Sequence, residues 1–350
     1  MPLSAVDVVN PAFERMKILF NPFRLGQWLR FALVGFLAGE MGQGGGCSAR
    51  LPLDVLTSQT SNELQGPISP ERGPLFIIGI VLLVLLVLTF GVILAYLNSR
   101  MRFVLFDSIL SGECRIRHFW SRRGVPAFGY FIFQIVLSLI GLTSLVVLVG
   151  IPALIVYGLG WFSNPGQHIL GFVLVGSILG MLFLAWVVVM VLVQVLTKDF
   201  VVPQMAIDGV SLSEGWNRLW SQVKDNRGAY AGYIGMKIIL RIAAVIATGV
   251  ATVIVLLVLL IPFGGVALVT VLLAQAAGIG WNPLTIAIAI VFGCVVFLLF
   301  LFLACLLAVP SIVFFPAYAM YFFAERYPAL HALLYLPPAE PDLSTLSPQP

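Results

Sequence analysis

Long uncharged apolar runs constrain this chain more than any other feature. The segment from Leu75 to Leu97 has no charged residue, and about 20 apolar residues in a helix cross the roughly 30 Å hydrocarbon core of a bilayer. Comparable runs cover Ala127–Phe162, Ile169–Thr197, Ala229–Pro262 and Leu284–Ala324. The chain is 60% hydrophobic and 10% charged, whereas a soluble domain carries about 25% charged residues. The sequence therefore predicts an all-α, polytopic membrane helical bundle.

The distribution of basic residues predicts six membrane spans. A weaker apolar run, Leu25–Met41, contains Gln27 and Arg30. If it is counted as the first span, all of the 19 Lys and Arg residues except Arg50 and Arg72 fall on one side of the membrane. The positive-inside rule makes that side cytoplasmic. We therefore expect a multi-pass protein of the bacterial cytoplasmic (inner) membrane with both termini in the cytoplasm, and the basic net charge needs no nucleic acid to explain it.

A glycine cluster, "AGEMGQGGGCSARLP", follows the first apolar run. A lipoprotein cleavage site needs a leucine-like residue three positions before the cysteine, but Gly44 stands there before Cys47. A dinucleotide loop needs glycines between a strand and a helix, and these follow a membrane helix. Glycines end helices well, so we interpret the cluster as a helix end and hinge that leads into a flexible external loop at residues 42–74.

Three copies of one pattern predict an internal repeat. Each copy combines an interfacial amphipathic helix, a short polar turn and a membrane hairpin. The matched positions of two copies are Phe103-Val104 with Phe200-Val201, Gly112 with Gly209, Trp120 with Trp220, Gly129-Tyr130 with Gly232-Tyr233, and Ile151-Pro152 with Ile261-Pro262. The N-terminus matches the same pattern through Phe13 and Arg15, opposite Trp216 and Arg218.

The amphipathic helix is clearest in the later copy. Ser211 and Glu214 have the spacing of a capping box, and apolar side chains follow at helical intervals: Leu212, Trp216, Leu219, Trp220 and Val223. A Trp-bearing apolar face with basic flanks suits a helix in the headgroup layer. Docking against the protein's own helices explains the same pattern, and the sequence leaves both alternatives open.

These patterns carry a resemblance to known proteins. The stretches "AFERMKILFNPFRLGQWLRFALVGFLA" and "FVVPQMAIDGVSLSEGWNRLW" resemble an uncharacterised family of bacterial multi-pass membrane proteins. The chain is also distantly similar to the membrane domain of glycerophosphoryl diester phosphodiesterases. The resemblance implies a single transmembrane domain over residues 1–335, followed by a disordered tail at residues 336–350. No phosphodiesterase domain is present, so that activity does not carry over.

The motif search predicts a protein that is not an enzyme. No HExxH, GxSxG or Walker loop occurs. The three histidines, His118, His168 and His331, are far apart and predicted on different membrane faces, so we expect neither a metal nor a cofactor.

Four basic residues are the candidate lipid-headgroup-binding residues. Lys237 and Arg241 share one helix face because they are four residues apart, and Arg218 and Arg227 precede them. Snorkelling to the cytoplasmic headgroups is the simpler explanation of Lys237 and Arg241; the sharper hypothesis is that their partners are the bilayer's anionic phospholipids. The expected role is lipid handling, membrane organisation or assembly with a partner protein. The alternative is a small-solute or lipid permease, or an exporter subunit.

Overall fold

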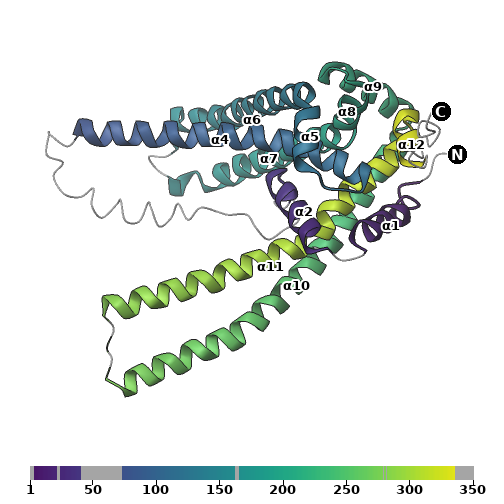
Figure 1. Ribbon diagram of the computed structural model, residues 1–350. Helices are drawn as coiled ribbons and strands as arrows, with labels where there is room; N and C mark the ends of the chain where they lie inside the picture. The colour runs from purple at the N-terminus through teal and green to yellow at the C-terminus, as the bar shows by residue number, and fades with distance from the viewer. Residues whose placement is uncertain are drawn as a thin grey trace, which may run out of the picture. The chain divides into compact units, whose positions relative to one another are not determined.

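The computed structural model describes residues 4–21, 24–40, 73–161, 165–278, 280 and 282–335, which are helical with short connections and contain no strand. The predicted all-α fold is confirmed. The helices, shown in Figure 1, are α1 (Val9–Phe20), α2 (Leu25–Leu37), α4 (Gly73–Ser111), α5 (Ile116–Arg122), α6 (Gly124–Gly158), the 3₁₀ turn η3 (Pro165–Gln167), α7 (Ile169–Leu196), the π turn η4 (Thr197–Val201), α8 (Val202–Asp208), α9 (Leu212–Asp225), α10 (Arg227–Ala276), α11 (Pro283–Ala324) and α12 (Pro328–Tyr335). The predicted loop at 42–74 lies almost wholly outside the described residues, and the tail at 336–350 lies entirely outside them.

Five of the described helical segments are long and apolar enough to cross a membrane. They are Ile78–Ser111, Gly124–Gly158, Ile169–Asp208, Arg227–Ala276 and Pro283–Ala324. On α4, every side chain from Ile78 to Leu94 is exposed, although nearly all are apolar. A helix that is apolar all round needs an apolar surrounding. This is a multi-pass membrane protein.

The structure differs from the predicted six spans at the first apolar run. Helix α2 has 13 residues and is therefore about 20 Å long, short of the roughly 30 Å hydrocarbon core. It ends at Gly39, whose φ is 72°. There the Glu40 N–H donates to the Gly35 carbonyl at 2.9 Å and the Gly39 N–H donates to the Phe36 carbonyl at 3.1 Å. This pair of bonds is a Schellman motif, so the first glycine of the predicted hinge ends a short helix.

The chain divides into two compact units. Unit 1 comprises Met1–Trp120 and Gly228–Tyr318, and unit 2 comprises Ser121–Arg227 and Ala319–Pro350. The prediction of a single transmembrane domain stays a prediction, and each unit is described by itself.

In unit 1, α2 packs antiparallel to the last turns of α4. Near the start of α2, the Gln27 side chain donates to the Gly112 carbonyl at 3.3 Å, and at its end the Ala38 carbonyl accepts from Arg102 at 3.1 Å. Further along, a Cβ atom at Gly35 would collide with Ile312 of α11. The buried part of α4, which includes Phe103, and the part of α11 from Val309 to Tyr318 contribute the buried residues of this unit's core.

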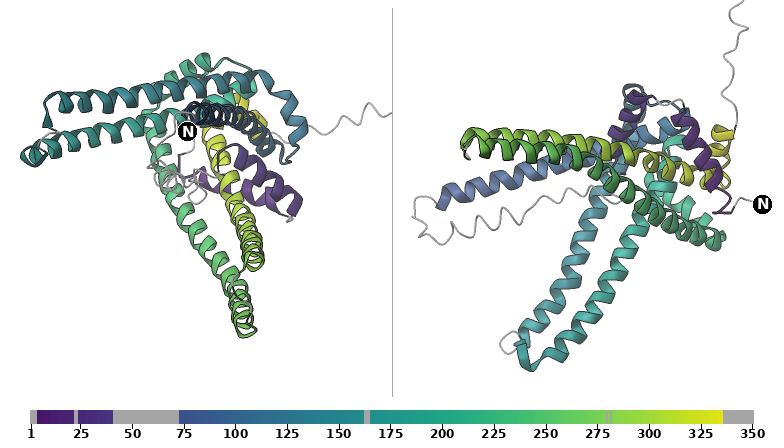
Figure 2. Two further views of the ribbon diagram at one scale, coloured as in Figure 1. Left: turned by 90° about the vertical axis from the view of Figure 1, so that its left-hand side faces the viewer. Right: turned by 90° about the horizontal axis from the view of Figure 1, so that it is seen from below.

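In unit 2, α6 and α7 form a closed hairpin. The indole N–H of Trp186 donates to the Ser144 hydroxyl at 2.8 Å, and the Trp186 ring packs beside Gly141 of α6. Beyond α7 the helix widens into η4, where Phe200 is fully buried and forms ring contacts with Phe322 and Phe323. Further views of these helices are given in Figure 2.

Candidate functional site

Lys237 and Arg241 lie on α10 at the point where it leaves the protein core. Tyr233, one turn earlier, is fully buried, whereas Ile238 and Ile242 are more than half exposed. A helix that changes from buried to exposed apolar residues over one turn passes there from protein into lipid, where the headgroups begin. The two cations therefore lie where α10 passes from its buried part to its exposed apolar part.

Both cations rest on aromatic rings. The Lys237 ammonium lies 5.6 Å from the centroid of the Tyr233 ring and donates to its hydroxyl oxygen at 3.4 Å. The Arg241 guanidinium carbon lies 4.1 Å from the centroid of the Phe315 ring. Lys237 is only 9% exposed, so the protein covers most of its side chain. A stacked guanidinium uses its planar face for the contact with the ring.

The rings that hold these cations are themselves fixed. Tyr233 stacks on Tyr318 with centroids 5.3 Å apart and planes 8° from parallel, and Tyr318 stacks in turn on Phe314 at 6.2 Å. The Tyr318 hydroxyl donates to the Ala5 carbonyl at 2.9 Å. Rigid supports of this kind hold a binding group in one geometry before the ligand arrives.

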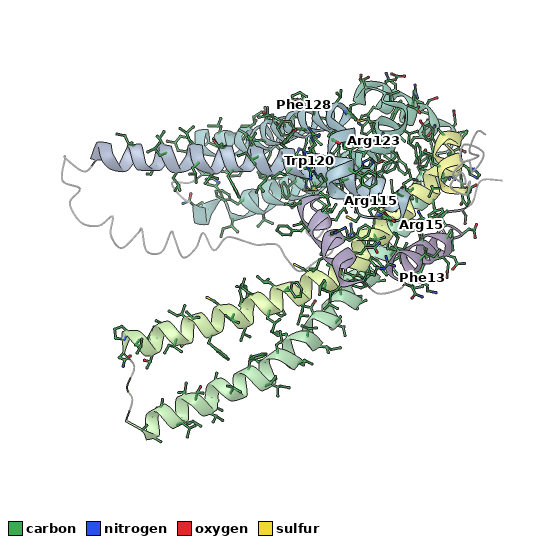
Figure 3. The ribbon with its side chains drawn as sticks, in the orientation of Figure 1. Phe13, Arg15, Arg115, Trp120, Arg123 and Phe128 are labelled. Carbon is green, nitrogen blue, oxygen red and sulfur yellow. The ribbon has the colours of Figure 1, made fainter. Side chains whose placement is uncertain are left out.

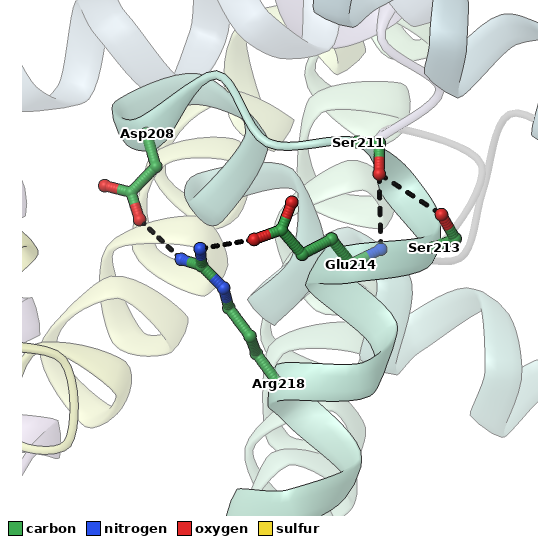
Figure 4. A network of polar contacts seen from close by, with 5 residues as sticks. All are labelled: Asp208, Ser211, Ser213, Glu214 and Arg218. Carbon is green, nitrogen blue, oxygen red and sulfur yellow. Dashed lines mark hydrogen bonds and ion pairs between the residues drawn. The ribbon is translucent and has the colours of Figure 1, made fainter.

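Arg218 is held in a different environment in unit 2. Its guanidinium bonds to Asp208 at 2.8 Å and to Glu214 at 2.5 Å (Figure 4). The hydrogen bond to Glu214, and after it the bond to Asp208, raise the pKa of Arg218 above its usual value. Two carboxylates more than balance its single charge, which weakens its predicted role in attracting an anionic headgroup.

The same network shows how α9 begins. The Ser211 hydroxyl accepts from the Glu214 N–H at 3.4 Å (Figure 4), which is one half of the predicted capping box. The Glu214 carboxylate bonds to Arg218 instead of returning to the start of the helix. The Tyr327 hydroxyl lies beside Asp208, although the geometry of the pair falls short of a hydrogen bond. Burial, and then the Asp208 carboxylate, raise the pKa of Tyr327 well above its usual value.

The four predicted headgroup residues divide between the units. Arg218 and Arg227 belong to unit 2, whereas Lys237 and Arg241 belong to unit 1. Arg227 is exposed at the start of α10. The convergence of all four stays a prediction, and Lys237 with Arg241 is the pair that the structure brings together.

Comparison with known protein families assigns the chain to a family. Residues 3–333 match a family of unknown function, DUF7544. The chain belongs to DUF7544. No curated protein and no solved structure matches it, so the predicted similarity to phosphodiesterase membrane domains stays a prediction. Membership covers nearly the whole chain, so all five apolar helices lie within the matched residues.

Most of the arginines that the sequence assigned to topology have a structural partner in this DUF7544 protein. Arg15 of α1 donates to the Ile109 carbonyl at 3.0 Å and to the Leu110 carbonyl at 2.7 Å. It points from α1 toward the end of α4, whereas Phe13 points away (Figure 3). Arg100 donates to the Trp120 carbonyl at 2.8 Å. The last carbonyls of a helix lack partners within it and carry partial negative charge, so these arginines cap helix ends.

Sequence reasoning missed one regular signal, an aromatic residue followed four positions later by a basic one. Residues at this spacing share a helix face, and a cation over an aromatic ring is attracted by the ring's quadrupole. Among the residues that the structure describes, five such pairs are in contact, with the cation 4.1 to 5.9 Å from the ring centroid: Phe13–Lys17, Tyr96–Arg100, Trp220–Lys224, Tyr233–Lys237 and Phe322–Arg326. The spacing is visible in the sequence and would have identified Tyr233 as the partner of Lys237.

Two glycines that the sequence matched between repeats have the same conformation. Gly112 ends α4 with a φ of 80°, and Gly209 ends α8 with a φ of 68°. The matched pairs Phe103-Val104 and Phe200-Val201 are buried in their respective units. Left-handed glycines stop helices, so both copies end a buried segment in the same way.

Proposed function

We propose that this DUF7544 member is a non-enzymatic protein of the bacterial inner membrane that binds anionic phospholipid through Lys237 and Arg241 on α10. The observation that carries the proposal is the pair of cations held on Tyr233 and Phe315, at the boundary between the core and the lipid-facing part of the helix. Each basic residue near an anionic surface contributes about 1 kcal/mol. The role that follows is lipid handling or membrane organisation at the cytoplasmic face.

Replacing Lys237 and Arg241 together by glutamine should weaken retention of phosphatidylglycerol and cardiolipin. The loss of two charges at about 1 kcal/mol each corresponds to more than about tenfold in affinity. Native mass spectrometry of the full chain with defined lipid additions measures the occupancy. The charge-preserving double variant Lys237→Arg with Arg241→Lys should retain most of the binding.

The matched control removes two other positive charges from unit 1. Lys17 pairs with Glu14 at 3.2 Å and Arg115 pairs with Glu113 at 2.6 Å, all more than half exposed. Lys17→Gln with Arg115→Gln should leave lipid retention nearly unchanged. Equal losses in both double variants would mean diffuse attraction without a site. No loss in either, together with solute flux through the wild-type chain in liposomes, would favour the permease alternative.

The proposed orientation makes a separate prediction in unit 2. Gln167 lies in η3, at the turn of the α6–α7 hairpin. Ser121 lies in α5, just before α6, and Ser221 lies in α9. All three are exposed. In a chain whose own cysteines are replaced, a cysteine at Gln167 should react with an impermeant maleimide on intact cells, and cysteines at Ser121 or Ser221 should react only after permeabilisation. The reverse pattern would overturn the cytoplasmic assignment of the basic side.

A further inference from the structure

Between the two arms of the α10–α11 hairpin of unit 1, near its turn, lies a cavity that is open to the surroundings. The cavity has a volume of about 380 Å³, within the range of small-molecule pockets. One wall is the α10 face from Val266 to Gln275, and the other is the α11 face from Thr285 to Phe292. Several lining residues are small, among them Ala267, Ala274 and Ala289. Larger side chains at these positions would fill the space.

The α6–α7 hairpin of unit 2 is more closely packed. Its two helices approach each other at several positions, and the Trp186–Ser144 hydrogen bond joins them. Between α10 and α11 close backbone approaches are rare. Phe263 and Phe292 meet with centroids 6.2 Å apart and limit the cavity toward the middle of the hairpin. An open hairpin is therefore a property of α10–α11 and not of membrane hairpins in this fold generally.

The residues that line the cavity favour an uncharged, largely apolar occupant. No Asp, Glu, Lys, Arg or His lies between Arg241 and Glu325, so the cavity offers no charge to an ion or a charged solute. Its polar lining consists of the Thr270 and Thr285 hydroxyls and the Gln275 amide, the last of these near the end of α10. The Thr270 hydroxyl donates to the Ala267 carbonyl at 2.8 Å. Such a site is apolar along its length, with a neutral hydrogen-bonding group at the turn.

The length of the cavity matches one leaflet. Residues 266 to 275 span about 14 Å at 1.5 Å per residue, close to half of the roughly 30 Å hydrocarbon core. The turn between α10 and α11 lies at the membrane surface when the rest of the hairpin is in hydrocarbon. Gln275 is then at the level of the ester groups of that leaflet, and Phe292 is near the bilayer midplane.

We propose that this cavity holds one acyl chain of a glycerophospholipid from the leaflet in which the hairpin turn lies, with the Gln275 amide at the level of its ester group. The acyl chain enters from the bilayer and fills the empty volume between the helices, which restores the dispersion contacts that a void lacks. This site is independent of the proposed headgroup binding at Lys237 and Arg241, because it uses the opposite end of α10.

The test uses the full chain in nanodiscs that contain phosphatidylcholine with a photoactivatable diazirine in one acyl chain. Irradiation followed by peptide mapping locates the labelled residues. Labelling should be stronger on the cavity faces of α10 and α11 than on the outward face of α10 at Leu272, which is 55% exposed and contacts bulk lipid. Equal labelling of Leu272 and the cavity faces would show that no chain enters.

Two variants with the same chemical change refine the result. Ala274→Phe fills the cavity and should remove most of the labelling from its walls. Ala276→Phe adds the same ring at an exposed residue outside the lining and should leave the labelling intact. Retained labelling of the walls in Ala274→Phe would overturn the proposal, as would cross-links from the cavity to a second copy of the chain. The wild-type map decides the question even where a variant fails to fold.

Discussion

Replacing Arg15 by alanine should destabilise the protein by about 3 kcal/mol, because hydrogen bonds from a charged donor contribute about 1.5–3 kcal/mol each. The change leaves the Ile109 and Leu110 carbonyls at the end of α4 without the guanidinium that caps them. It also releases α1 from α4. The midpoint of unfolding in mixed micelles of a mild detergent and dodecyl sulfate measures the effect.

Two further variants distinguish the effect of capping the carbonyls from the effect of the positive charge at Arg15. Arg15→Lys keeps the positive charge but lacks the planar fork that reaches two carbonyls at once, so it should recover only a small part of the loss. Lys17→Ala removes an exposed ion pair with Glu14 and should change the stability by less than about 1 kcal/mol. Wild-type stability in Arg15→Lys would mean that Arg15 acts through its charge alone.

Replacing Leu219 by glutamate should release α9 from unit 2. Leu219 is 1% exposed, and burying an unpaired charge costs several kcal/mol. Beside it, Gly215 lies so close to Val201 that a Cβ atom would come within 2.9 Å of the valine side chain. The segment should become open to limited proteolysis in the folded, detergent-solubilised chain.

The matched variant is Trp220→Glu, one position along the same helix. Trp220 is 55% exposed, so this change should leave the proteolytic protection of α9 intact. If Trp220 lies in the headgroup layer, its replacement should weaken contact of α9 with lipid without loosening the fold. Equal protection in wild type and Leu219→Glu would contradict the docked position of α9.

The sequence predicted α9 closely because its signals are local. The Ser211 cap and the spacing of Leu212, Trp216 and Leu219 each depend on neighbours within one or two turns. The choice between lipid and protein for its apolar face was left open, since both environments favour the same residues. Burial of Leu219 and Gly215 shows that one side of α9 docks on the protein.

The helix-end contacts of the arginines could not be predicted from local sequence patterns. Arg15 and Ile109 are 94 positions apart, and the positive-inside rule accounts for a basic residue at Arg15 without reference to any carbonyl. In the sequence, the short apolar stretch between Arg30 and Gly39 predicted only a weak first span. The structure makes α2 a short helix with its own stop signal, because the apolar stretch between those two residues is too short to cross the hydrocarbon core.

Helix α4 links the bilayer mechanically to the core of unit 1. Its 39 residues extend about 58 Å at 1.5 Å per residue, nearly twice the thickness of the hydrocarbon layer. The lipid-facing half and the buried half are one continuous rod without an internal proline. A thinner bilayer that tilts such a rod also tilts the turns that contain Phe103 and Ile109. We therefore expect a change in membrane thickness to load the contacts of α1 and α2 at the far end of α4.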